Sequence, residues 1–148
     1  MLWVMKQITT EIRINAPASR VWAVLTNFPR YPQWNPFITR IEGQPQIGTR
    51  LSITIQPPEA NSMTFRPVVL RADSERELRW LGRLLLPKVF DGEHSFIIES
   101  VGEGAVLFKQ SELFGGLLVP LLWGKIGNKT QRGFEMMNEA LKKVSEAR

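Results

Sequence analysis

Two side chains that can exchange protons flank a predicted hairpin turn late in the chain. His94 is the only histidine and lies nine residues before Glu103, whereas Glu112 lies nine residues after Glu103. The turn at residues 101–104 contains two glycines, which adopt positive φ without strain. A hairpin centred on Glu103 makes His94 and Glu112 direct cross-strand partners, with Cβ atoms about 5 Å apart. An imidazole and a carboxylate at that distance can act as acid and base, or can orient a polar group of a ligand.

The pattern leaves several roles open for this pair. The plainest is structural: a buried pair that satisfies its own hydrogen bonds, or a pair in water at a rim. If the pair has a role toward a ligand, we favour orientation of a polar ligand group over catalysis. We expect no metal site and no cofactor, because no second histidine is present and no Asp or Glu cluster has ligand spacing. No Ser–His–Asp order and no glycine-rich phosphate loop are present.

A long amphipathic helix is predicted for residues 117–144. Its apolar positions follow helical spacing, and charged residues occupy the opposite face. The predicted buried face consists of Leu118, Leu122, Ile126, Thr130, Phe134, Met137, Leu141 and Val144. Such a helix is too long to bury this face against one short helix, so it needs a broad partner.

The rest of the chain supplies strands. Residues 6–14 alternate between apolar and polar types, which predicts a half-buried strand. A short helix is predicted for residues 17–27, followed by a segment that Pro29, Pro32 and Pro36 restrict to turns and at most one helical turn. Further strands are predicted for residues 38–42, 49–56, 62–73, 77–84, 92–100 and 105–114, and Pro67 inside one of them indicates an edge or a bulge.

The order of elements predicts an α+β domain that spans residues 1–148. A curved antiparallel sheet of six to seven strands surrounds the C-terminal helix, with two short helices after the first strand. Residues 1–5 either extend the first strand or precede a native start at Met5. A curved sheet and a straight helix cannot touch along their whole length, so we expect an internal cavity between them.

Alternation assigns a lining to this cavity. We expect its main wall to comprise Trp80, Phe96, Phe108, Phe134 and Met137. Asn35 either contacts the ligand or stabilises its own turn, and Trp22 and Trp80 also fit an ordinary core. The full set of predicted ligand-contacting residues is Trp34, Asn35, Leu78, Trp80, His94, Phe96, Phe108, Gln110, Glu112, Leu118, Leu122, Ile126, Phe134 and Met137.

The amino-acid composition limits the kinds of partner that the protein is expected to bind. The net charge of +5 is spread along the chain without a run of Lys or Arg, so we do not expect nucleic-acid binding. No apolar run reaches the roughly 18 residues that span a bilayer, so we expect a cytoplasmic protein without stable membrane insertion. Two segments are unusually apolar, and they either pack on each other or make transient contact with a membrane or a protein beside the cavity mouth. These segments are Leu84, Leu85 and Leu86, and Leu117, Leu118 and Val119.

Several stretches resemble the polyketide cyclase/START-like superfamily, also called SRPBCC or Bet v 1-like. They are residues 14–22, residues 31–37, Leu78-Arg79-Trp80, residues 91–96, residues 112–118 and the closing helix. The resemblance extends in order over essentially the whole chain and implies the helix-grip fold. Members of the family bind lipids, sterols, hormones or polyketides, and a minority catalyse cyclisation or dehydration.

The leading functional hypothesis is therefore binding of a small hydrophobic or amphipathic molecule, lipid-, sterol- or polyketide-like, without a cofactor. The alternative is a polyketide cyclase or dehydratase that uses His94 and Glu112 as acid and base. A third hypothesis is an interaction module whose apolar rim docks a protein.

Overall fold

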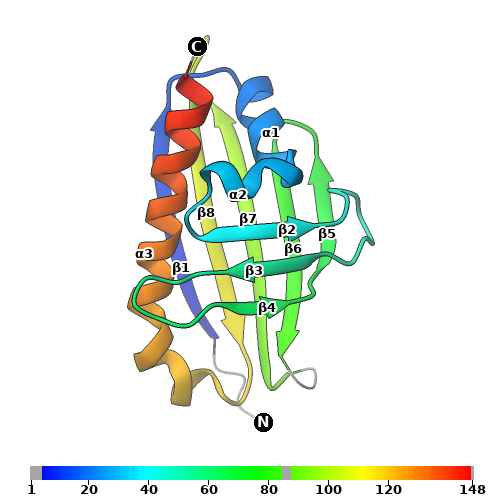
Figure 1. Ribbon diagram of the computed structural model, residues 1–148, viewed down its shortest axis with the longest axis vertical. Coiled ribbons are helices and arrows are strands. Elements are labelled where there is room, and N and C mark those ends of the chain that lie inside the picture. The colour runs from blue at the N-terminus through cyan, green and yellow to red at the C-terminus, as the bar shows by residue number, and fades with distance from the viewer. Residues whose placement is uncertain (1–4, 85–87, 148) are drawn as a thin grey trace.

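The computed structural model describes residues 5–84 and 88–147. Figure 1 shows a long helix, α3 (Val119–Glu146), beside a strongly twisted sheet, with the short helices packed at one end. The predicted order of strand, short helices, strands and long helix is confirmed. The other elements are β1 (Met5–Ile14), α1 (Ala18–Thr26), η1 (Phe28–Arg30), α2 (Tyr31–Trp34), β2 (Ile38–Glu42), β3 (Ser52–Ile55), β4 (Met63–Phe65), β5 (Val68–Asp73), β6 (Glu77–Leu84), β7 (Phe90–Ser100) and β8 (Val106–Gly115).

The strands form two antiparallel sheets that continue into each other. Five strands follow the order β1-β8-β7-β6-β5, and three follow the order β2-β3-β4. The smaller sheet crosses in front of the larger one in Figure 1. Backbone hydrogen bonds join them: the N–H of Leu51 donates to the Pro67 carbonyl at 2.8 Å, and the N–H of Val69 donates to the Thr49 carbonyl at 2.9 Å. The result is the predicted α+β fold, a curved antiparallel β-structure around a long C-terminal helix.

One predicted strand is divided in two. Residues 62–73 form β4, which pairs with β3, and β5, which pairs with β6. Pro67 lies between them and has no N–H to donate to a ladder, so continuous pairing through this point is disfavoured. The described part of the chain accordingly contains eight strands, in place of the six or seven expected.

Helix α3 begins two residues later than predicted. The N–H groups of Leu117 and Leu118 donate to the carbonyls of Lys88 and Val89, at 3.1 and 3.0 Å, so these two residues are held by neighbouring backbone. Gly116 precedes them with φ of 129°, and a Cβ at this position would lie 2.5 Å from the Val89 carbonyl oxygen. Only glycine fits this close approach, which fixes where the helix can start.

The buried face of α3 changes along its length. Phe134, Met137 and Leu141, in its C-terminal half, are fully buried, and the helix lies along β1. Leu122 and Ile126, in the N-terminal half, are only partly buried. The helix therefore packs tightly against the sheet at its C-terminal end and leaves space at its N-terminal end. No helix within the described ranges is long and apolar enough to cross a membrane.

Candidate functional site

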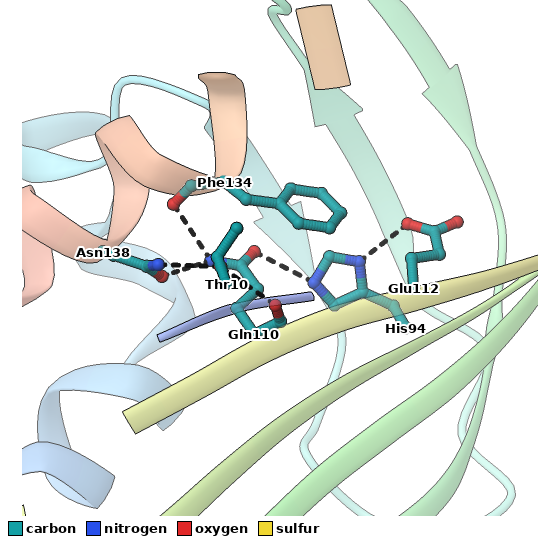
Figure 2. A network of polar contacts seen from close by, with 6 residues as sticks. All are labelled: Thr10, His94, Gln110, Glu112, Phe134 and Asn138. Carbon is teal, nitrogen blue, oxygen red and sulfur yellow. Dashed lines mark hydrogen bonds and ion pairs between the residues drawn. The ribbon is translucent and has the colours of Figure 1, made fainter. Parts of the chain in front are cut away.

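The hairpin of β7 and β8 brings His94 and Glu112 together as predicted. The strand register pairs the two residues directly, and the turn glycines Gly102 and Gly104 have φ of 121° and 71°. His94 Nδ1 lies 2.9 Å from Glu112 Oε1, which is a hydrogen bond with ion-pair geometry (Figure 2). The sequence therefore located both members of the central pair from the turn alone.

Aromatic rings surround the imidazole. The Trp80 ring stacks on it at a centroid distance of 5.3 Å, and the rings of Phe96 and Phe134 lie 4.6 and 4.8 Å away. His94 is only 4% exposed, whereas the Glu112 side chain is 18% exposed. The carboxylate is thus the member of the pair that is accessible from outside this aromatic enclosure.

A chain of buried polar side chains continues behind the imidazole, as Figure 2 shows. His94 Nε2 lies 3.0 Å from Gln110 Oε1, and Gln110 Nε2 donates to Asn138 Oδ1 at 2.7 Å and to the Phe134 carbonyl at 3.3 Å. Asn138 Nδ2 donates to Thr10 Oγ1 at 2.9 Å, and the Thr10 hydroxyl donates to the Gln110 carbonyl at 2.9 Å. Strands β1, β7 and β8 and helix α3 all contribute to this network.

The direction of this chain fixes the tautomer of His94. The carbonyl groups of Gln110 and Phe134 can only accept, so the Thr10 hydroxyl donates to the first, and the Gln110 amide nitrogen donates to the second. The Asn138 amide group is then oriented as well, because its oxygen must accept from Gln110. Gln110 Oε1 is left as an acceptor, and His94 Nε2 must carry a hydrogen.

A tautomer fixed in this way leaves one proton between His94 Nδ1 and Glu112 Oε1. The pair is either an imidazolium with a carboxylate or a neutral imidazole with a carboxylic acid that donates from Oε1. Both forms have zero net charge, which suits burial among aromatic rings because an uncompensated charge there is costly. In both forms, Glu112 Oε2 carries no hydrogen and remains an acceptor.

A cavity of about 220 Å³ lies against this pair. Strands β2, β3, β4, β6, β7 and β8 and helix α3 contribute residues to its wall, together with the loop between β3 and β4. The wall is mostly apolar, and it includes Phe37, Ile38, Ile53, Ile55, Pro57, Met63, Phe65, Trp80, Phe90, His94, Glu112, Phe114, Leu122 and Ile126. Its exposed or half-buried polar members are Asn61, Arg83, Lys125, Lys129 and Thr130, which mark the solvent side.

Five of the residues predicted to contact a ligand lie on the wall of this cavity. Trp80, His94, Glu112, Leu122 and Ile126 are on the cavity wall. Phe96, Phe108, Phe134 and Met137 do not lie on this wall: they are fully buried and fill the space between sheet and helix, as does Leu78. Alternation identifies the inward face of a strand but not the depth at which packing closes, so the cavity lies farther toward the N-terminal half of α3 than expected.

The remaining predicted residues lie off the wall. Gln110 is buried behind His94, and Leu118 is partly buried against the core. Trp34 packs edge-on against Tyr31, with ring centroids 5.0 Å apart. Asn35 Oδ1 accepts hydrogen bonds from the N–H groups of Phe37 and Ile38, each at 2.9 Å, so Asn35 stabilises its own turn. Neither Trp34 nor Asn35 reaches the cavity.

Sequence reasoning missed Thr10 and Asn138. Asn138 lies four residues after Phe134 and three before Leu141, so helical spacing already placed a polar side chain on the apolar face. Thr10 shares its strand face with Ile8 and Ile12. A polar residue on each of two facing apolar surfaces is a signal for a buried hydrogen bond between them.

Of the two apolar segments predicted beside the cavity mouth, the structure describes the second in full and the first only in part. Leu85 and Leu86 lie outside the described residues, as does the side chain of Leu84. Val119 is fully buried, so of the two alternatives the outer contact is excluded for this residue. Leu117, two residues before α3, and Leu121, in its first turn, are 61% and 74% exposed. The part of the chain that the structure covers contains no cluster of metal-ligating side chains.

Comparison with known proteins agrees with this architecture. A family model described as "Polyketide cyclase / dehydrase and lipid transport" matches residues 5–146. No curated protein matches the chain in sequence. The solved structures that are similar include norcoclaurine synthase from Thalictrum flavum, as a point mutant in complex with a transition state analogue. It is 18% identical, with a TM-score of 0.76, and the alignment covers 98% of this chain and 96% of that one.

Two further structures show the same fold. The Zhui aromatase/cyclase from Streptomyces sp. R1128 is 16% identical, with a TM-score of 0.73 and coverage of 97% of this chain and 94% of that chain. A START superfamily protein from Mycobacterium smegmatis is 17% identical, with a TM-score of 0.69 and coverage of 93% and 98%. At these identities the likeness concerns the fold.

Proposed function

Because the chain belongs to the polyketide cyclase/dehydrase and lipid transport family, we propose that it binds a small hydrophobic or amphipathic molecule in the cavity beside α3. The observation that carries the proposal is an apolar cavity of about 220 Å³ with Glu112 and His94 on its wall. Ligand sites commonly combine an apolar wall with a few placed polar groups.

The volume limits the size of the ligand. An apolar cavity of about 150 Å³ is sufficient for benzene. A cavity of 220 Å³ therefore suits a compact skeleton such as a bicyclic aromatic, or one part of a longer chain. A complete sterol or a fully enclosed fatty acid needs more space than this conformation offers, so a small ring system is favoured within the broader lipid-, sterol- or polyketide-like class.

The test is a calorimetric titration with 2-methoxynaphthalene, which is apolar and bicyclic. The variant Ile126→Trp places a larger side chain on the cavity wall, and we expect it to bind the probe at least about tenfold more weakly than the wild type. Leu121→Trp is the matched control, because it makes a similar change on the same helix at an exposed position away from the wall. Equal binding by both variants would rule out the cavity as the binding site.

A second candidate function is acid–base catalysis. It is favoured by the hydrogen bond of 2.9 Å between His94 and Glu112 at the cavity wall, because catalytic acids and bases must lie within hydrogen-bonding reach of the groups that they serve. The family to which the chain belongs also includes cyclases and dehydrases.

Exchange of the α-protons of 2-tetralone into heavy water, followed by NMR, tests this candidate. Wild-type protein should accelerate the exchange above the buffer rate, and Glu112→Met should not. Exchange at the buffer rate with wild-type protein would remove support for the catalytic candidate and leave the binding proposal in place.

As part of the same proposal, the residues around the start of α3 make a transient contact with a membrane. Leu117 and Leu121 are highly exposed, Lys125 follows Leu121 by four residues, and the Lys88 carbonyl accepts from the N–H of Leu117. Apolar side chains flanked by lysines suit an anionic lipid surface. A transient contact of this kind would let a hydrophobic ligand enter from a bilayer.

A further inference from the structure

Glu112 presents one oxygen atom that the protein leaves without a partner. Oε1 is engaged by His94 Nδ1, whereas Oε2 accepts no hydrogen bond from any residue in the described part of the chain. The carboxyl group lies over Gly92, where an added Cβ would be only 2.2 Å from Oε2. Glycine at position 92 thus provides the space that the carboxyl group of Glu112 occupies beside the cavity.

The buried network fixes the hydrogen-bonding character of this oxygen. Because His94 Nε2 donates to Gln110, the single shared proton lies between His94 Nδ1 and Glu112 Oε1, and Oε2 is an acceptor in either protonation form. Trp80 is another fully buried wall residue with a polar group, an indole N–H that can only donate, and the remaining polar side chains of the wall belong to exposed or half-buried residues. At the aromatic end of the cavity, the acceptor that the ligand meets is therefore Glu112 Oε2, beside the indole N–H of Trp80.

We infer that the ligand is a small cyclic molecule with a hydroxyl group, phenolic or alcoholic, that donates a hydrogen bond to Glu112 Oε2. This inference rests on the proposed function and names the chemical class of its ligand. An ether or a ketone of the same size leaves Oε2 without a donor, and a carboxylate places a second acceptor against the first. An acceptor that the ligand covers without supplying a donor is costly enough to weaken binding by about tenfold.

The geometry also assigns positioning roles to three residues that do not touch the ligand. Gln110, Asn138 and Thr10 hold the tautomer of His94, and His94 in turn holds Oε1 of Glu112. Oε2 is thereby held in one orientation beside Gly92, another residue of the cavity wall, so the acceptor is in place before the ligand arrives. Preorganisation of this kind reduces the ordering cost of binding.

The experiment compares 2-naphthol with 2-methoxynaphthalene, its methyl ether, whose oxygen cannot donate. Wild-type protein should bind 2-naphthol about tenfold more tightly. Glu112→Met removes the acceptor, and the ratio of the two dissociation constants should fall to about one. Glu112→Gln should keep the preference, because its amide nitrogen can donate to His94 Nδ1 while its oxygen takes the place of Oε2.

Each outcome separates the two proposals. If wild-type protein binds neither probe, the proposed function fails together with the inference. If it binds both equally, or if Glu112→Met keeps the preference for 2-naphthol, the hydroxyl inference is overturned while cavity binding stands. Should Glu112→Met not fold, Gly92→Ala provides the second variant, because its Cβ displaces the carboxyl group and must also reduce the preference.

Discussion

Asn138 in α3 donates a hydrogen bond to Thr10 in β1 at 2.9 Å, across 128 residues of sequence. Both side chains are buried, and both belong to the chain of contacts that ends at the cavity wall. The packing of the C-terminal helix on the first strand is therefore coupled to the orientation of His94. Folding of the two ends of the chain and construction of the site depend on the same polar network.

Replacement of Asn138 by leucine should destabilise the protein by about 1–3 kcal/mol, because Gln110 then loses one of its acceptors and Thr10 loses a donor. Denaturant unfolding measures the change. Asn128→Leu is the matched control, since Asn128 is exposed on the same helix, and it should change stability by less than about 0.5 kcal/mol. Equal effects at both positions would show that the buried network contributes nothing specific.

Leu117→Ser combined with Leu121→Ser should weaken co-sedimentation with phosphatidylserine-containing vesicles by about tenfold, because two exposed apolar side chains no longer enter the bilayer. The melting temperature should change little. Ile47→Ser is the control, as Ile47 is 68% exposed and lies outside α3. If the double variant binds vesicles as well as the wild type does, the proposed membrane contact is wrong.

Acid should weaken the anchoring of the C-terminus of α3. The hydrogen bond from Lys142, together with one from the Asn15 backbone, holds the pKa of Glu146 below its ordinary value of 4.5. A carboxyl group whose pKa is lower in the folded protein contributes stability above its unfolded pKa, and this contribution disappears as the pH falls through the folded pKa.

The difference in unfolding free energy between wild type and Glu146→Gln should therefore be larger at about pH 6 than at about pH 3. Urea unfolding at the two pH values measures this, and Glu135→Gln, exposed on the same helix, serves as the control. A difference that is independent of pH would show that the contacts of the Glu146 carboxylate add no stability.

A contact in the site can be predicted from the sequence when its residues lie in one hairpin or one helix, and not when they lie in separate elements. The pairing of His94 with Glu112 was predictable because one glycine-containing turn sets the register of its two strands. The amphipathic helix was predictable for a similar reason, since its buried face is a matter of spacing along one segment. The contacts of Gln110, Asn138 and Thr10 were not, because they depend on how three separate elements pack.

The position of the cavity shows the same limit. Strand alternation directed Phe96 inward and helical spacing did the same for Phe134, but only the packing decides that these rings fill the space while Ile126 and Trp80 border a void. The contribution of the loop between β3 and β4 also escaped prediction, because Pro57, Ala60 and Asn61 carry no periodic signal. Family resemblance correctly indicated the fold, but it does not specify which residues line the cavity.

Binding in this cavity is the central claim, and the isoleucine methyl groups report on it directly. Ile38, Ile53, Ile55 and Ile126 lie on the cavity wall, whereas Ile14 and Ile97 lie elsewhere and Ile47 is on the surface. Methyl NMR spectra recorded during titration with 2-naphthol should show shifts at the four wall residues that saturate together. Ile14, Ile47 and Ile97 should stay unchanged. Shifts confined to the latter three, or no saturable shift at any methyl group, would contradict the account.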